Sequence, residues 1–176
     1  MPPDRGTAAR ASMGPMLRRA RGVDEAHAAL AVLREAAAWA SAAGLGMWEP
    51  AELREADYEA AAAADELVIG FEGEVIVATA LLQTVDTVYW PEARPGAALY
   101  VHKVAVRRIA AGHGWLARLI DFAAEDARAR GIPLLRLDTV LRPKLRAMYE
   151  AFGFRVLEEP PLTVYGRRVI RLERPA

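Results

Sequence analysis

A glycine-rich turn, residues 107–117, lies where a strand-like pattern gives way to a helix-like one. Gly112 and Gly114 within this turn allow the backbone to come close to a ligand. The first N–H groups of the helix that follows have no partner inside that helix, and they face outward at the positive end of its dipole. The turn therefore predicts a binding site for a pyrophosphate.

The spacing of the turn also matches a dinucleotide fingerprint. Gly112, Gly114 and Ala117 have that spacing, and Asp138 follows Gly114 by 24 positions, near where a ribose-binding acid is expected. The first glycine of the fingerprint directly follows its strand, however, whereas residues 107–111 intervene here. A dinucleotide site is therefore the more distant alternative.

The turn is part of a longer pattern. A Val-Ala-Val strand end at residues 104–106, a five-residue loop, the Gly-His-Gly turn and, downstream, Tyr149-x-x-x-Gly153-Phe154 together resemble the GNAT superfamily of N-acetyltransferases. The resemblance covers residues 100–156 and implies that acetyl-CoA is the acyl donor. It implies donor contacts from Val104, Ala105, Val106, Ala111, Gly112, His113, Gly114, Trp115, Leu116, Ala117 and Arg142.

Three of these positions depart from the family's usual residues. Family members usually have Arg or Gln in place of Ala111, Gly or Ala in place of Leu116, and often Asn in place of Arg142. These departures bear on the affinity for the donor more than on the fold. They leave open a non-catalytic acyl-CoA-binding or sensing module as the alternative to an enzyme.

Tyr149 is the candidate general acid. It occupies the tyrosine position of the family motif, and the resemblance implies that it lies near the thiol of the donor. A buried phenol also needs a polar partner. Simple packing on the apolar face that Tyr149 shares with Leu145, Met148 and Phe152 is the alternative.

His102 is the candidate general base. Strand alternation places Tyr100, His102 and Val104 on one face, provided that no bulge intervenes. The resemblance implies that a histidine on this strand relays the proton of the amine, and an imidazole with a pKa near 6.5 suits that role. A histidine that only forms hydrogen bonds within the sheet fits the pattern equally well.

Contacts to the acceptor are expected from residues 45–50, between the first two predicted helices, and from the stretch that holds Tyr89 and Trp90. Met47 and Trp48 are large apolar side chains in a loop, where recognition residues often lie; packing of Trp48 into the core is an equal alternative. Tyr100 is the third predicted acceptor contact. These residues indicate a small-molecule or peptide amine with an apolar or flat portion.

Composition excludes several other functions. The 176 residues include no cysteine, which excludes a disulfide framework, a thiolate zinc site and an acyl-cysteine intermediate, so the amine is expected to attack the donor directly in a ternary complex. The three histidines have no paired spacing, so no metal is expected. The 23 basic residues balance the 23 acidic ones, and we expect neither nucleic acid nor a membrane as partner. A homodimer is left open.

The chain is expected to form one soluble, cytoplasmic domain over residues 16–176, after a disordered leader at 1–15. The fold class is α/β or α+β: a central mixed sheet flanked by helices, with one right-handed βαβ crossover that forms the acyl-CoA site of a GNAT-like fold. A run of arginines, Arg167, Arg168, Arg171 and Arg174, is interpreted as a solvated strand edge. Helices are predicted at 24–43, 51–64, 113–130 and 144–151, and strands at 66–71, 74–82, 97–106, 134–139, 154–158 and 164–173.

Overall fold

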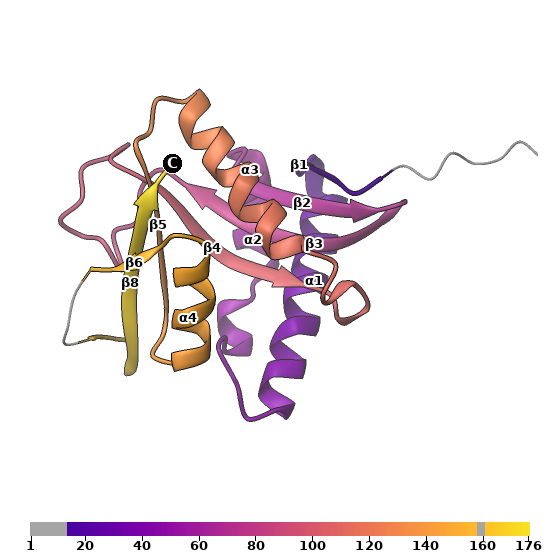
Figure 1. The fold of residues 1–176 in the computed structure, drawn as a ribbon. Coiled ribbons are helices and arrows are strands. Elements are labelled where there is room, and N and C mark those ends of the chain that lie inside the picture. Colours follow the sequence, from indigo (N-terminus) through magenta and orange to yellow (C-terminus); the bar gives the residue numbers. More distant parts are fainter. Residues whose placement is uncertain (1–13, 158–160) are drawn as a thin grey trace, which may run out of the picture.

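The computed structural model describes residues 14–157 and 161–176, and these residues build one mixed β-sheet between two layers of helices (Figure 1). The predicted leader at 1–15 falls almost entirely outside the described residues, as does the end of the strand predicted at 154–158. No helix in the described ranges is long and apolar enough to span a bilayer.

The sheet runs in the order β1-β2-β3-β4-β5-β8-β6, with β7 paired to β8. Only β4 and β5 pair in parallel; all other described pairs are antiparallel. The predicted mixed sheet with one parallel crossover is therefore confirmed. The strands are β1 (Met16–Arg19), β2 (Leu67–Glu72), β3 (Val75–Gln83), β4 (Leu99–Val106), β5 (Leu134–Val140), β6 (Arg155–Val156), β7 (Leu162–Val164) and β8 (Arg167–Pro175).

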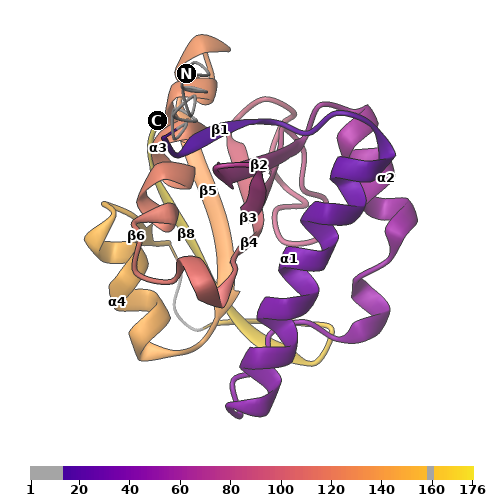
Figure 2. The same cartoon turned by 90° about the vertical axis from the view of Figure 1, so that its right-hand side faces the viewer.

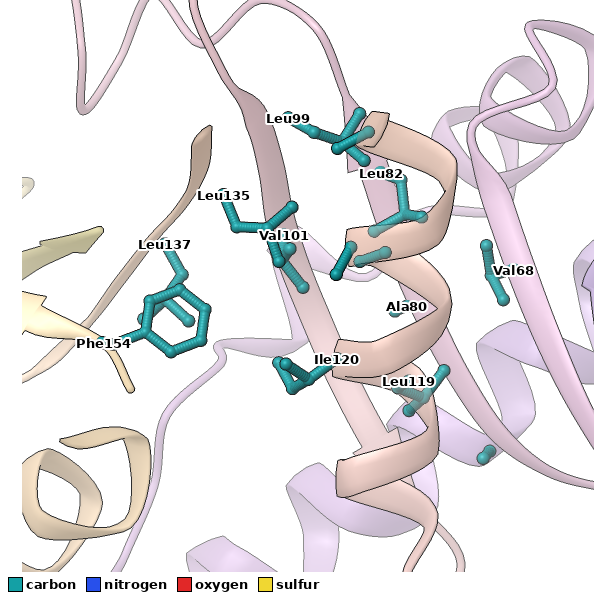
Figure 3. Close-up of a cluster of buried hydrophobic side chains, with 14 of the residues drawn as sticks. Val68, Ala80, Leu82, Leu99, Val101, Leu119, Ile120, Leu135, Leu137 and Phe154 are labelled. Carbon is teal, nitrogen blue, oxygen red and sulfur yellow. The ribbon is translucent and has the colours of Figure 1, made fainter. Parts of the chain in front are cut away.

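In the described part of the chain, four α-helices cover the two faces of the sheet: α1 (Gly22–Ala42) and α2 (Glu55–Ala63) on one face, α3 (Trp115–Ala129) and α4 (Pro143–Ala151) on the other (Figure 2). Helix α3 carries the apolar stripe that its sequence predicts, and its Leu119 and Ile120 are buried against β3, β4 and β5 (Figure 3). On the opposite face, Leu30 and Leu33 of α1 pack with Tyr58 of α2. Apolar burial on both faces holds the central strands in place.

Two terminal elements differ from the prediction. The strand expected at 164–173 is a hairpin of β7 and β8, because Tyr165 and Gly166 both adopt positive φ angles, 48° and 76°, which form a tight turn. The sequence does not predict strand β1, because its four residues do not alternate between apolar and polar side chains. It pairs with the edge of β2.

Strands β4 and β5 separate soon after they meet. Their register pairs only Leu99 with Leu135 and Tyr100 with Arg136, and Figure 1 shows β4 turning away from β5 toward its carboxyl end. Among the described strands, none therefore pairs with this backbone edge of β4 beyond Tyr100. A ligand can reach this edge.

A bulge at Lys103 interrupts β4. Leu81 and Thr79 of β3 pair with His102 and Ala105 of β4. One residue lies between the two β3 residues and two lie between the two β4 residues, so β4 has one extra residue here. Lys103 takes the positive φ angle of 50° that accommodates the extra residue. The expectation that Val104 shares a face with Tyr100 and His102 is therefore wrong: Val104 packs toward the α3 cluster.

Candidate active site

A cavity of about 350 Å³ opens where β4 and β5 separate. It brings together five of the predicted site residues: Met47, Trp48, His102, Val104 and Tyr149. We call it the acceptor cavity. Further lining comes from Glu52, Leu81, Gln83, Asp86, Val88, Tyr89, Val101, Lys103, Asp138, Thr139, Val140, Tyr165, Arg167 and Val169.

His102 lies between two carboxylates in this cavity. Its Nε2 is 3.3 Å from Oδ2 of Asp86, and its Nδ1 is 3.4 Å from Oδ1 of Asp138. Burial alone would lower the pKa of the imidazole, but the two carboxylates outweigh it and raise the pKa to about 9. At neutral pH the ring is therefore protonated, in contrast to the expected value near 6.5.

Asp86 is fixed by the backbone of its own loop. Its Oδ1 accepts hydrogen bonds from the N–H groups of Val88 and Tyr89 at 3.0 and 2.9 Å, and only 5% of its side chain is exposed. Burial opposes ionisation, but the contact with His102 and the two N–H groups hold the pKa of this carboxyl below its usual value. A buried negative charge thus supports the protonated imidazole.

Tyr149 reaches the same cavity from α4. Its ring meets Phe154 edge to face, with ring centroids 6.0 Å apart. Burial, helped by the negative charge of Asp138, raises the pKa of its phenol to about 12. The phenol is therefore in its proton-donating form throughout the neutral range.

The loop at residues 45–49 is held over the cavity by Arg167 of β8. The Arg167 guanidinium donates to the carbonyl of Met47 at 2.9 Å and forms ion pairs with Glu49 and Glu52 at 3.3 and 3.1 Å. The interpretation of this arginine as part of a solvated strand edge is therefore wrong. The same holds for Arg171, which is 7% exposed and paired with Glu92.

Tyr100 does not line the acceptor cavity. Its side chain is 1% exposed, packs on Trp90, and stacks on the imidazole of His102 with ring centroids 6.4 Å apart. An acceptor cannot touch a side chain covered in this way, so the prediction of Tyr100 as an acceptor contact is wrong. Its place in the structure is that of a support for the His102 ring.

A second cavity, of about 300 Å³, lies at the amino end of α3, and we call it the donor cavity. Gly112 and Gly114 there take positive φ angles of 84° and 78°, as the turn requires. The cavity brings together Val106, Ala111, Gly112, Gly114, Trp115, Leu116 and Ala117 as predicted, and adds Ala110 and Phe152.

Glu72, at the end of β2, anchors the start of α3. Its carboxylate accepts a hydrogen bond from Nε1 of Trp115 at 2.7 Å and contacts Nδ1 of His113 at 2.9 Å. These contacts lower the pKa of the Glu72 carboxyl, the hydrogen bond of Trp115 having the larger effect. The turn that faces the donor cavity is thus tied to the hairpin of β2 and β3.

Four of the predicted donor contacts do not line the donor cavity, and one of them, Val104, lines the acceptor cavity instead. The side chain of Ala105 is buried on the α1 face of the sheet, so only its backbone can serve a ligand at the β4 edge. His113 points toward Glu72 and does not line the donor cavity. Arg142 donates to the carbonyls of Leu45 and Gly46 at 2.8 and 3.2 Å, which makes it a contact of the loop over the acceptor cavity.

Within the described residues, Asp86, His102 and Asp138 are the one group of His and acidic side chains close enough to share a metal ion, with ligand atoms within 4.8 Å of one another. Each ring nitrogen of His102 faces its own carboxylate, at 3.3 and 3.4 Å. The expectation that no metal is present stays a prediction.

Sequence reasoning missed Glu52, Asp86 and Lys103 as cavity residues, and it did not place Asp138 in the acceptor site. No motif marks them, because they come from four separate segments that the fold brings together. For Asp138 a signal existed: it lies near the carboxyl end of a predicted parallel strand, where ligands often bind in α/β sheets.

The model of the acetyltransferase (GNAT) family matches residues 31–154 of this chain. No curated protein matches the sequence.

Solved structures share the fold over nearly the whole chain. A GNAT-family acetyltransferase from Listeria monocytogenes has a TM-score of 0.76 and 19% identity, with 92% of this chain and 95% of that one covered. The PaiA N-acetyltransferase of Thermoplasma acidophilum, solved with coenzyme A, has a TM-score of 0.71 and 12% identity, with 93% and 100% covered. The ribosomal-protein-S18-alanine N-acetyltransferase of Escherichia coli has a TM-score of 0.63 and 17% identity, with 92% and 93% covered.

Proposed function

Because the chain belongs to the GNAT family of acetyltransferases, we propose that it transfers the acetyl group of acetyl-CoA to the amine of a small molecule by direct attack in a ternary complex. The observation that carries the proposal is the order of the two cavities. Val104 of β4 lines the acceptor cavity and Val106 lines the donor cavity. Likewise, Tyr149 of α4 lines the acceptor cavity, and Phe152, directly after α4, lines the donor cavity. A donor held at the start of α3 would thus extend along β4 toward Tyr149 and His102.

The donor cavity suits the pyrophosphate of acetyl-CoA. The N–H groups of Trp115, Leu116 and Ala117 open α3 and have no partner within the helix. The exposed edge of β4 offers backbone groups from Val104 to Val106 to the pantetheine arm. Leu116 lines the cavity together with Phe152 and the glycines of the turn.

Tyr149 is proposed as the general acid. Acetyl-CoA supplies the acetyl group as a thioester, and the C–S bond breaks as the amine nitrogen bonds to the carbonyl carbon. Tyr149 then donates its phenolic proton to the departing thiolate, a step for which its pKa of about 12 keeps the proton available.

His102 is proposed as the general base in its neutral form. It accepts a proton from the amine, and the resulting imidazolium is stabilised by Asp86 and Asp138. Since the pKa of His102 is about 9, this form predominates only in alkaline solution. The proposal therefore predicts a reaction that accelerates as the pH rises.

The acceptor is proposed to be a small amine with an apolar or flat portion, as the sequence suggested. Met47, Trp48, Tyr89 and Tyr165 provide apolar and aromatic surface around the acceptor cavity, whose volume of about 350 Å³ fits a small molecule. A peptide terminus remains the second acceptor class to be tested, since the E. coli neighbour acts on a protein alanine.

Two measurements test the proposed function. Thermal denaturation with acetyl-CoA, CoA or NAD is expected to show stabilisation by the two CoA ligands, because binding to the native state raises stability; stabilisation by NAD alone would overturn the proposal. Release of free CoA thiol with a panel of amines is then expected. Stabilisation without thiol release from any amine or peptide would favour the acyl-CoA sensing module instead.

A further inference from the structure

The three cations that line the acceptor cavity are not equally neutralised. His102 has a carboxylate within 3.4 Å of each ring nitrogen, and Arg167 has Glu52 at 3.1 Å and Glu49 at 3.3 Å. Among the described residues, Lys103 has one carboxylate within 4.0 Å, that of Glu52, whose nearest oxygen is 3.9 Å from Nζ. Arg167 and Lys103 therefore share Glu52, and Arg167 lies closer to it than Lys103 does.

The ammonium of Lys103 also lacks other acceptors. Within the part of the chain that the structure describes, it donates no hydrogen bond, and its remaining neighbour is the ring of Trp48, 6.0 Å from Nζ. Its side chain is 26% exposed. Burial lowers the pKa of this amine despite the attraction of Glu52 and Asp138, which shows that its charge is poorly compensated.

The backbone directs Lys103 into the cavity at a cost. A φ angle of 50° is unfavourable for a residue with a β carbon, and Lys103 adopts it at the bulge of β4. Lys103 and the neighbouring His102 both line the cavity. Backbone strain of this kind concentrates where it positions a functional group.

We infer, building on the proposed acetyl transfer, that the acceptor carries a carboxylate as well as an amine, and that Lys103 binds this carboxylate while the amine faces His102 and Asp138. An anion beside Lys103 would give its ammonium a closer counter-ion than Glu52, which is 3.9 Å away. A group with two negative charges fits less well, because Glu52, Asp86 and Asp138 line the same space. With the aromatic lining, this chemistry describes an amino acid with an apolar side chain.

The test compares two product analogues that differ in the carboxylate alone: N-acetyl-L-phenylalanine and N-phenethylacetamide. Calorimetric titration of each into the full chain, with CoA present, is expected to show at least about tenfold tighter binding of the acid. Thiol release from L-phenylalanine and from phenethylamine gives a parallel ratio of kcat/KM.

Variants assign the preference to one side chain. Lys103→Met is expected to bring the ratio of the two Kd values close to one, and Lys103→Arg is expected to keep it. Lys144→Met is the matched control, since Lys144 is the only other lysine of the chain and lies exposed on α4, outside the cavity. In Lys144→Met, the ratio of the two Kd values is expected to equal that of the wild-type protein.

Three results overturn the inference: equal binding of the two analogues, a preference that survives in Lys103→Met, or binding of neither. The calorimetric result does not depend on turnover. Binding of the acid with the expected preference, but without thiol release from any amine, would therefore count against the proposed transfer while upholding the role of Lys103.

Discussion

Nδ1 of His102 lies 3.4 Å from a carboxylate oxygen of Asp138, although the two residues belong to strands that no longer pair at this level. The contact crosses the opening between β4 and β5. Asp86 completes it from the other side of the ring, 3.3 Å from Nε2. Together the two carboxylates explain why the pKa of His102 is raised to about 9.

The rate of acetyl transfer is expected to rise with pH through an apparent pKa of about 9, because only neutral His102 can accept the proton of the amine. A profile of kcat/KM against pH measures this rise, which forms the ascending limb of the profile. In His102→Gln the limb should disappear, and the rate at pH 9 should fall by about 10² or more. A profile left unchanged by His102→Gln would remove His102 from the mechanism.

Replacement of Asp138 by Asn is expected to move the same limb to lower pH. Asp138 is the larger of the two carboxylate influences that raise the pKa of His102, so without its charge the ring loses its proton more easily. The displacement is read from the kcat/KM profile. A limb that stays in place belongs to another group, such as the amine substrate.

Protein stability is expected to fall between about pH 6.5 and pH 9. The pKa of His102 is raised on folding, so its contribution is fully present below the unfolded value near 6.5 and is lost as the pH rises through about 9. The upper bound of the loss is about 3 kcal/mol. Chemical denaturation at several pH values measures it, and His102→Gln should show a flatter dependence over the same range.

Tyr149→Phe is expected to lower kcat by about 10² or more and to leave the Kd for acetyl-CoA nearly unchanged. The substitution removes only the hydroxyl, so the edge-to-face contact with Phe154 survives. Thiol release and calorimetric titration of acetyl-CoA measure the two quantities. Unchanged turnover would leave packing as the only role of Tyr149.

Gly70→Ala is expected to destabilise the protein by about 1 to 3 kcal/mol and to weaken acetyl-CoA binding. A β carbon at Gly70 would lie 2.4 Å from Cζ3 of Trp115, the fully buried residue that opens α3 and lines the donor cavity. Thermal denaturation with and without acetyl-CoA measures both effects. Gly46→Ala is the control, because nothing lies within 4 Å of its added carbon; equal behaviour of the two variants would contradict the prediction.

Arg142→Met is expected to raise KM for the acceptor several-fold, because Arg142 holds the carbonyls of Leu45 and Gly46 in the loop above the acceptor cavity. The Kd for acetyl-CoA is expected to stay within about twofold of the wild-type value. The opposite pattern, with weakened acetyl-CoA binding and an unchanged KM for the acceptor, would restore Arg142 to the donor site.

The elements around the donor site could be predicted because their determinants are local. The apolar stripe of α3, the glycines at 112 and 114 and the strand before them are neighbours in the chain, and their conformations depend on one another rather than on distant segments. The same is true of the parallel crossover, since a strand, a helix and a strand in succession permit few arrangements. Ala110 and Phe152 were missed there because neither carries a chemical signal.

The acceptor site could be predicted only in part. Tyr149 and His102 were found from a motif and from strand alternation, but alternation failed directly after His102. One extra residue in β4 at Lys103 reversed the side on which Val104 lies. Nothing in the residue types around 103 marks a bulge, because its position is set by pairing with β3.

The sequence by itself determined the strand–helix–strand crossover, the glycine turn that opens α3 and the absence of a cysteine nucleophile, all of which depend on residue type and short spacing. Only the tertiary structure decided the charge of the site. It placed Asp86 and Asp138 on opposite sides of His102, bound Arg142 and Arg167 to the loop at 45–49, and left Lys103 with a distant counter-ion. Electrostatic interactions depend on distance and burial, and for residues from separate strands and loops both are known only once the chain has folded.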